Sequence, residues 1–124
     1  MAALLTRPAV LLRVEGAALL ALSALLYMLG GMSWTLFLLL VLAPDLSMLG
    51  YLKGSRVGAL SYNLGHTYLP PTVLVAFGAL AGKPLYVSLG LIWFAHIGFD
   101  RMMGFGLKYP TGFGDTHLGR ISGV

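Results

Sequence analysis

Long apolar runs, separated by short turns, occupy most of the chain. They extend over residues 9–29, 33–52, 57–81 and 85–103, and the rest of the chain holds most of the charged residues. A helix of about 20 apolar residues is long enough to cross the ~30 Å hydrocarbon core of a bilayer. The pattern therefore predicts an all-α, polytopic membrane domain with four transmembrane helices, followed by a Gly-rich C-terminal tail over residues 104–124.

The composition supports this interpretation and limits the kinds of functional site that the chain can form. Of the 124 residues, 58% are hydrophobic and only 10% are charged, a balance far more apolar than that of ordinary soluble domains. The chain has no cysteine, which excludes disulfides and thiolate sites and leaves histidine and carboxylate as strong metal ligands. The formal charge of +4 comes from cations at the ends of apolar runs, so we expect a lipid bilayer and no nucleic acid as partner.

The distribution of cations predicts an orientation. Only Lys83 lies on one side of the four predicted spans. The other side holds Arg7, Arg13, Lys53, Arg56, Arg101, Lys108 and Arg120. Because cytoplasmic loops carry the excess of Lys and Arg, this bias places both termini in the cytoplasm of a multi-pass protein of the bacterial inner membrane.

Prolines interrupt two of the runs. Pro44 lies in the second run, directly before Asp45, and Pro70–Pro71 lies in the third. A proline inside a helix removes one backbone hydrogen bond and bends or breaks the helix. We therefore expect a freed carbonyl group next to the Asp45 carboxylate, and a kink about one turn after His66.

Ionisable side chains inside the apolar runs are the candidates for function. His96 and Asp100 are one helical turn apart on one face. At ~1.5 Å per residue, Asp45, His66 and His96 lie ~10–14 Å from the cytoplasmic ends of their spans and Asp100 lies ~5 Å from its end. Antiparallel packing should bring these four side chains together as ligands of a divalent metal such as Zn²⁺ or Mn²⁺. The predicted ligands are His66, His96, Asp100 and Asp45. Asp45 and Asp100 are also the candidate catalytic residues, and haem between the two histidines is less favoured because carboxylates occupy the same level.

Two further groups are ambiguous. The tail contains Asp115 and His117, which could fold back over the cytoplasmic mouth and complete the metal site, or could belong to a solvated tail in which Asp115 caps a turn. Glu15 lies near Arg13 in sequence and near Arg101 in predicted depth, and an ion pair at the helix end explains it better than a ligand role.

Four stretches carry a family resemblance: APDLSMLGY from residue 43, YNLGHTY from 62, HIGFDR from 96 and GFGDTHLG from 112. Together they resemble, over nearly the whole chain, the small bacterial membrane proteins of domain-of-unknown-function family 4260, for which no activity is implied. A weaker similarity runs to the inner-membrane metal-dependent hydrolases. It implies that Asp45, His66, His96 and Asp100 are counterparts of that family's site residues. Ser47 and Asn63 stand where that family has an aspartate and, nearby, a histidine, so the implied ligand set is smaller.

These observations favour a metal-dependent hydrolase-like site that opens to the cytoplasm and acts on a lipid-like substrate. A second hypothesis is a non-enzymatic small subunit or scaffold, in a homo-oligomer or a larger membrane complex, whose buried polar residues fix helix packing. A third is transport of protons or cations, for which acidic and histidine side chains in a broken helix are suited.

Overall fold

The computed structural model describes residues 2–121, which are mostly helical. The helices are α1 (Ala2–Leu5), α2 (Pro8–Leu29), α3 (Trp34–Leu40), the 3-10 helix η1 (Ala43–Lys53), α4 (Ser55–His66), α5 (Leu69–Leu80) and α6 (Pro84–Met103). A short antiparallel hairpin of β1 (Asp115–Thr116) and β2 (Gly119–Arg120) lies in the tail. The predicted all-α class is confirmed, whereas α1 and the hairpin were not predicted, and residues 122–124 of the predicted tail lie outside the described range.

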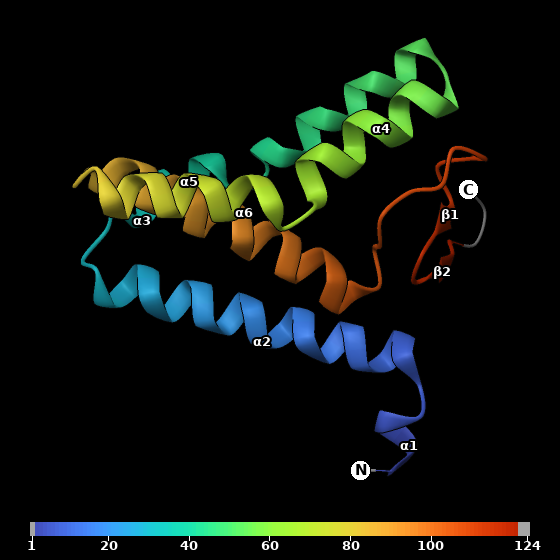
Figure 1. The fold of residues 1–124 in the computed structure, drawn as a ribbon, viewed down its shortest axis with the longest axis horizontal. Coiled ribbons are helices and arrows are strands. Elements are labelled where there is room, and N and C mark those ends of the chain that lie inside the picture. The colour runs from blue at the N-terminus through green and yellow to red at the C-terminus, as the bar shows by residue number, and fades with distance from the viewer. Residues whose placement is uncertain (1, 122–124) are drawn as a thin grey trace.

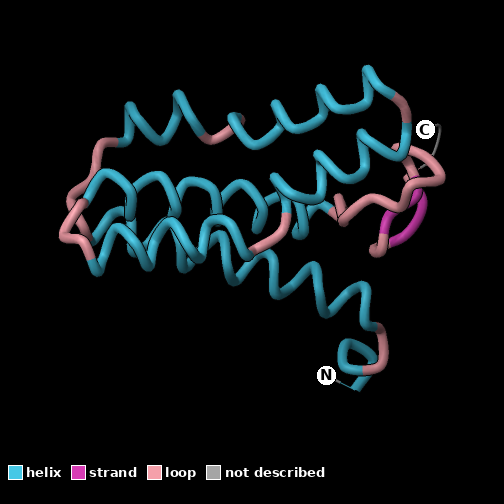
Figure 2. Tube along the Cα trace, turned by 45° about the horizontal axis from the view of Figure 1, so that its top comes forward, coloured by secondary structure: helices cyan, strands magenta, loops and turns pink. Residues whose placement is uncertain are grey.

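The helical segments run back and forth along the molecule (Figure 1). α2, α3 with η1, α4 with α5, and α6 alternate in direction, and the tube in Figure 2 shows the same arrangement from a second angle. α2 and α5 both pack against α6, while α4 packs against η1. The start of α2, the turn between η1 and α4, and the tail lie at one end of the molecule (Figure 1).

Both proline-containing segments are broken; the sequence predicted a bend or break in the first and a kink in the second. Residues 41–42 separate α3 from η1, and Thr67 and Tyr68 separate α4 from α5. The prolines lie in the first turns of η1 and α5, where the missing N–H has no intrahelical partner in any case. The run over 57–81 is therefore two helices and not one kinked helix, because Thr67 adopts extended backbone at φ −97° and ψ 157°.

Helices α2 and α6 come together at two glycines. A Cβ atom added at Gly98 would lie 2.8 Å from both the Gly16 carbonyl oxygen and the Leu20 amide nitrogen. A Cβ atom at Gly16 would lie 2.6 Å from the Cβ atom of Arg101. Only glycine permits this backbone approach, and the packing fixes the position of α6 and of the side chains that it carries.

Much of the apolar surface remains exposed. Large apolar side chains face outward along α2, α3, η1, α4 and α5, for example Leu39 at 73% and Leu80 at 89% exposure. Two helical stretches, Pro8–Leu29 and Trp34–Lys53, are long and apolar enough to cross a membrane. Because soluble monomers rarely expose such large apolar areas, these features support association with a membrane.

Two of the cations used to predict the orientation are buried. Arg101 is 7% exposed and Lys108 is 4% exposed. Arg101 donates from Nη2 to the carbonyl oxygen of His66 at 3.0 Å, which satisfies a free carbonyl at the end of α4. These two residues therefore serve interior contacts, and the charge bias at this end of the molecule rests on the exposed cations Arg7, Arg13, Lys53, Arg56 and Arg120.

Candidate metal centre

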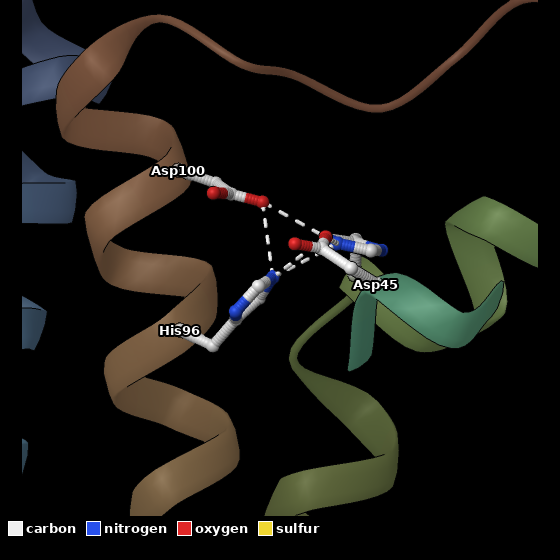
Figure 3. Close-up of side chains that lie close together, drawn as sticks. Asp45, His96 and Asp100 are labelled. Carbon is white, nitrogen blue, oxygen red and sulfur yellow. Dashed lines mark hydrogen bonds and ion pairs between the residues drawn. The ribbon is translucent and has the colours of Figure 1, made fainter. Parts of the chain in front are cut away.

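Four side chains from three elements point to one place (Figure 3). Asp45 lies in the first turn of η1, and His66 is the last residue of α4. His96 and Asp100 lie one turn apart on α6. One ligand atom from each of the four residues lies within 4.8 Å of all the others. The predicted convergence is confirmed, and we call these four residues the His/Asp cluster.

The distances inside the His/Asp cluster suit a tetrahedral ion. The Nε2 atoms of His66 and His96 are 3.1 Å apart, and the Asp45 Oδ1 atom is 3.1 Å from both of them. The Asp100 Oδ2 atom is 3.3 Å from each Nε2 atom. A tetrahedral ion with ligands at ~2.0–2.1 Å has ligand–ligand distances of ~3.3–3.4 Å. The distances that involve an imidazole therefore suit a Zn²⁺-sized ion, and the two carboxylate oxygens lie within 4.8 Å of each other.

Backbone carbonyls orient both imidazole rings. His96 Nδ1 lies 2.6 Å from the Val41 carbonyl oxygen, and His66 Nδ1 lies 2.8 Å from the Tyr62 carbonyl oxygen. A carbonyl can only accept, so each Nδ1 donates its proton and each Nε2 of the neutral ring carries a lone pair. The Val41 carbonyl is free because the helix breaks here and the Asp45 amide bonds to Leu42.

This arrangement of ring nitrogens and carboxylates favours the binding of a positive charge between them. When both imidazoles are neutral, the two Nε2 lone pairs lie 3.1 Å from each other and 3.1–3.3 Å from the two carboxylate oxygens, with no donor hydrogen between these atoms. The side chains of His66 and His96 are 3% exposed and that of Asp100 is 13% exposed. Buried acceptors without a donor are costly, and a cation at their centre would satisfy all four. Asp45, at 38% exposure, forms the open side.

The end of α4 is held rigidly beside the His/Asp cluster. Trp93 Nε1 donates to the Gly65 carbonyl at 2.6 Å, and the Tyr62 ring stacks on the His66 imidazole at 3.8 Å between centroids. Ser47 Oγ lies 3.3 Å from His66 Nδ1 and donates to the Pro44 carbonyl at 2.7 Å. Sequence reasoning gave Trp93 no role, because an indole in an apolar run is usually a packing or interface residue.

The structure does not bring the other two predicted ligands into the His/Asp cluster. Asp115 accepts from Thr111 Oγ1 at 2.7 Å and pairs with Arg120. His117 Nδ1 accepts from the Leu107 amide at 2.8 Å. Both side chains make contacts within the tail, and neither belongs to the group of four that could hold an ion.

The tail nevertheless lies over the site, through residues that the sequence reasoning missed. A cavity of about 240 Å³ is lined by Asp45 and Asp100 from the His/Asp cluster and by Phe105, Lys108 and Phe113 from the tail. Asn63 on α4 marks the attachment point, because its amide bonds to the Lys108 backbone. The polar side chain of Asn63, on the same helical face as His66, was the available signal.

Glu15 is exposed on α2. The expected ion pair with Arg13 or Arg101 is absent among residues 2–121, where Arg13 Nε instead donates to the Met102 carbonyl at 3.0 Å. The interpretation of Glu15 as an ion-paired helix-end residue is therefore wrong, and the residue is also outside the His/Asp cluster.

The His117 contact predicts a pH-dependent tail. Burial and the nearby Arg101 charge lower the pKa of His117, so the unfolded tail binds a proton before the folded tail does. The stability from this contact is complete above about pH 6.5 and is lost as the pH falls toward the lower pKa of the folded state. Hydrogen exchange of the Leu107 amide, corrected for its intrinsic rate, should show less protection at pH 5.5 than at pH 7.5. Equal protection at both would contradict this expectation.

One family of known sequences matches nearly the whole chain. The family described as Domain of unknown function (DUF4260) matches residues 9–121. The chain belongs to the DUF4260 family. All four residues of the His/Asp cluster and the tail residues over it lie within this DUF4260 region. No curated protein and no solved structure matches the chain, so the weaker similarity to metal-dependent hydrolases stays a hypothesis.

Proposed function

We propose that this DUF4260 protein is a membrane hydrolase that uses a divalent metal held by the His/Asp cluster and acts on a lipid-like substrate. The observation that carries the proposal is the approach of two imidazole Nε2 atoms, one from His66 and one from His96, to the same two carboxylate oxygens at 3.1–3.3 Å. Mixed nitrogen and oxygen ligands at tetrahedral spacing favour Zn²⁺ over Mn²⁺, which prefers more oxygen ligands.

The four residues have different roles in this proposal. His66, His96 and Asp100 are the most buried and hold the ion, since catalytic zinc sites use three protein ligands and keep one open position. Asp45 is the most exposed and also lines the 240 Å³ cavity, so in this proposal its Oδ1 atom gives up the fourth ligand position to a water molecule and accepts a proton from it. The ion, when bound, supplies Lewis-acid polarisation of a phosphoryl or acyl group and acidifies a water molecule.

The surroundings support a lipid-like substrate and four membrane passes. A second cavity, of about 280 Å³, is almost entirely apolar and is lined by Ala43, Pro44 and Trp93 among others. It adjoins the helix break that carries Asp45, so an acyl chain could lie beside the polar site. The alternating helical segments and their exposed apolar side chains fit four passes. The exposed cations at the end that holds the start of α2 and the tail fit a cytoplasmic location for that end.

Two matched aspartate variants test the assignment of roles. In detergent-purified protein loaded with Zn²⁺, we expect Asp100→Asn to lose most of the bound metal and Asp45→Asn to keep it. Both variants should lose hydrolysis of a chromogenic p-nitrophenyl phosphate or acyl ester by ~100-fold or more, because a general base contributes 10²–10⁴-fold. Metal content and release of p-nitrophenol are the two measurements.

The outcomes separate the competing functions. Metal-loaded wild-type protein that hydrolyses neither class of ester would contradict the hydrolase. In that case the metal is structural, and the scaffold hypothesis replaces the hydrolase hypothesis. Asp45→Asn with wild-type turnover would overturn the role given to Asp45.

A further inference from the structure

Lys108 has an unusual environment. Its side chain is buried, and within residues 2–121 its Nζ atom has no hydrogen-bond partner. The ammonium group lies 3.9 Å from the centre of the Phe113 ring and 4.8 Å from that of Tyr62. Burial lowers the pKa of Lys108, and the charge of Asp100 only partly opposes this effect. Lysine is almost never fully buried unless it is paired, so the contacts seen here leave it without an anionic partner.

Lys108 lines the same cavity as two residues of the His/Asp cluster. The cavity of about 240 Å³ is lined by Lys108 on the tail side and by Asp45 and Asp100 on the other side. Its remaining wall is largely apolar, with Met48, Phe105 and Phe113 among its residues. At ~30 Å³ per water molecule, this volume holds roughly eight waters, enough for a tetrahedral anion.

The backbone of Lys108 is fixed in place. Asn63 Nδ2 donates to the Lys108 carbonyl at 2.8 Å, and the Lys108 amide donates to Asn63 Oδ1 at 2.6 Å. Lys108 also forms an antiparallel bridge with Thr116. A binding group that is held before its ligand arrives loses less entropy when the ligand binds.

The charges in the cavity define what fits beside this ammonium. Two carboxylates and a divalent cation together have no net charge, and the two imidazoles are neutral as metal ligands. Lys108 then leaves one positive charge without a partner in a low-dielectric cavity. A carboxylic ester has no negative charge to pair with the Lys108 ammonium. A phosphate ester carries such a charge and also presents a phosphoryl group to the metal. Lysine is a common phosphate ligand.

We propose that Lys108 binds the phosphate of an amphiphilic phosphate ester in the cavity that it shares with Asp45 and Asp100. This inference rests on the proposed function and narrows its substrate class from phosphoryl or acyl compounds to phosphoryl compounds. The same anion site accepts inorganic phosphate, while the apolar wall favours a phosphate that carries an alkyl chain.

The test measures binding and not turnover. Inorganic phosphate and hexylphosphonate, a stable analogue of an alkyl phosphate, are titrated into Zn²⁺-loaded protein by calorimetry and by thermal unfolding. We expect Lys108→Met to weaken binding of both by at least about tenfold, because a hydrogen bond to a charged group contributes 1.5–3 kcal/mol. Lys108→Arg should bind within a few-fold of wild type, and Lys83→Met, which removes an exposed lysine at the other end, should not differ from wild type.

The outcomes distinguish this inference from the proposed function. Both ligands should raise the unfolding temperature of the wild type but not of Lys108→Met, and Lys108→Met should keep its Zn²⁺. If Lys108→Met keeps its metal and binds both anions as the wild type does, the phosphate site is wrong and the metal site stands. If the wild type binds no metal but its phosphate binding depends on Lys108, the proposed function is wrong and the anion site stands. Tighter binding of hexylphosphonate than of phosphate supports a lipid headgroup, and the reverse order contradicts the amphiphilic substrate.

Discussion

Replacing His96 with alanine is expected to abolish stoichiometric Zn²⁺ binding. His96 supplies one of two imidazole ligands, and its Nε2 atom is within 3.3 Å of the ligand atoms of His66, Asp45 and Asp100. Loss of an outer residue that only orients a ligand weakens metal binding by ~10–100-fold, so loss of a direct ligand should weaken it by at least ~100-fold. Equilibrium dialysis with Zn²⁺ measures the change.

His117→Ala is the matched control for this experiment. His117 lies outside the His/Asp cluster and its Nδ1 accepts from the Leu107 amide. We therefore expect this variant to keep its metal while its tail becomes less stable. A His96→Ala protein that is folded by circular dichroism and retains full Zn²⁺ would show that the imidazole is not a ligand and that its contacts with Val41, Asp45 and Asp100 are structural.

Gly98→Val is expected to lower the free energy of unfolding by about 3 kcal/mol, or to prevent folding. The new side chain would begin 2.8 Å from the Gly16 carbonyl oxygen and the Leu20 amide nitrogen. Backbone atoms cannot move aside as a side chain can, so α2 and α6 must separate. Thermal unfolding in detergent and the yield of monodisperse protein are the measurements.

The control for the steric argument is Gly112→Val. A Cβ atom at Gly112 would have only ordinary contacts, the nearest at 3.4 Å to the Asp115 carboxylate. We expect this variant to unfold within about 0.5 kcal/mol of wild type, as surface substitutions usually do. If Gly98→Val were equally stable, helices α2 and α6 could not be in the close contact described here.

The sequence predicted the parts of the site that depend on local rules. Pro44 and Pro70–Pro71 predicted where the helices break, because proline acts through its own backbone. The depth of Asp45, His66, His96 and Asp100 followed from the helical rise and the alternation of direction. Helix geometry and short connections are enough to place side chains at one level, and the structure confirms that these four meet.

Other parts depend on contacts between distant segments and could not be predicted locally. Asn63 and Lys108 are 45 residues apart in sequence, so the burial of Lys108 follows from how the tail folds back. Arg101 could be counted as a surface cation until α4 was seen to end against it. The two tail residues predicted as ligands have partners within the tail itself: Asp115 pairs with Arg120, and His117 accepts from the Leu107 amide.

The central claim is that the His/Asp cluster holds a divalent metal, and metal analysis of the wild-type protein tests it most directly. The protein is purified in detergent, incubated with excess Zn²⁺ or Mn²⁺ and dialysed. Elemental mass spectrometry should then find about one ion per chain, with Zn²⁺ retained in preference to Mn²⁺. Wild-type protein that is folded and yet retains neither ion after this treatment would contradict the account.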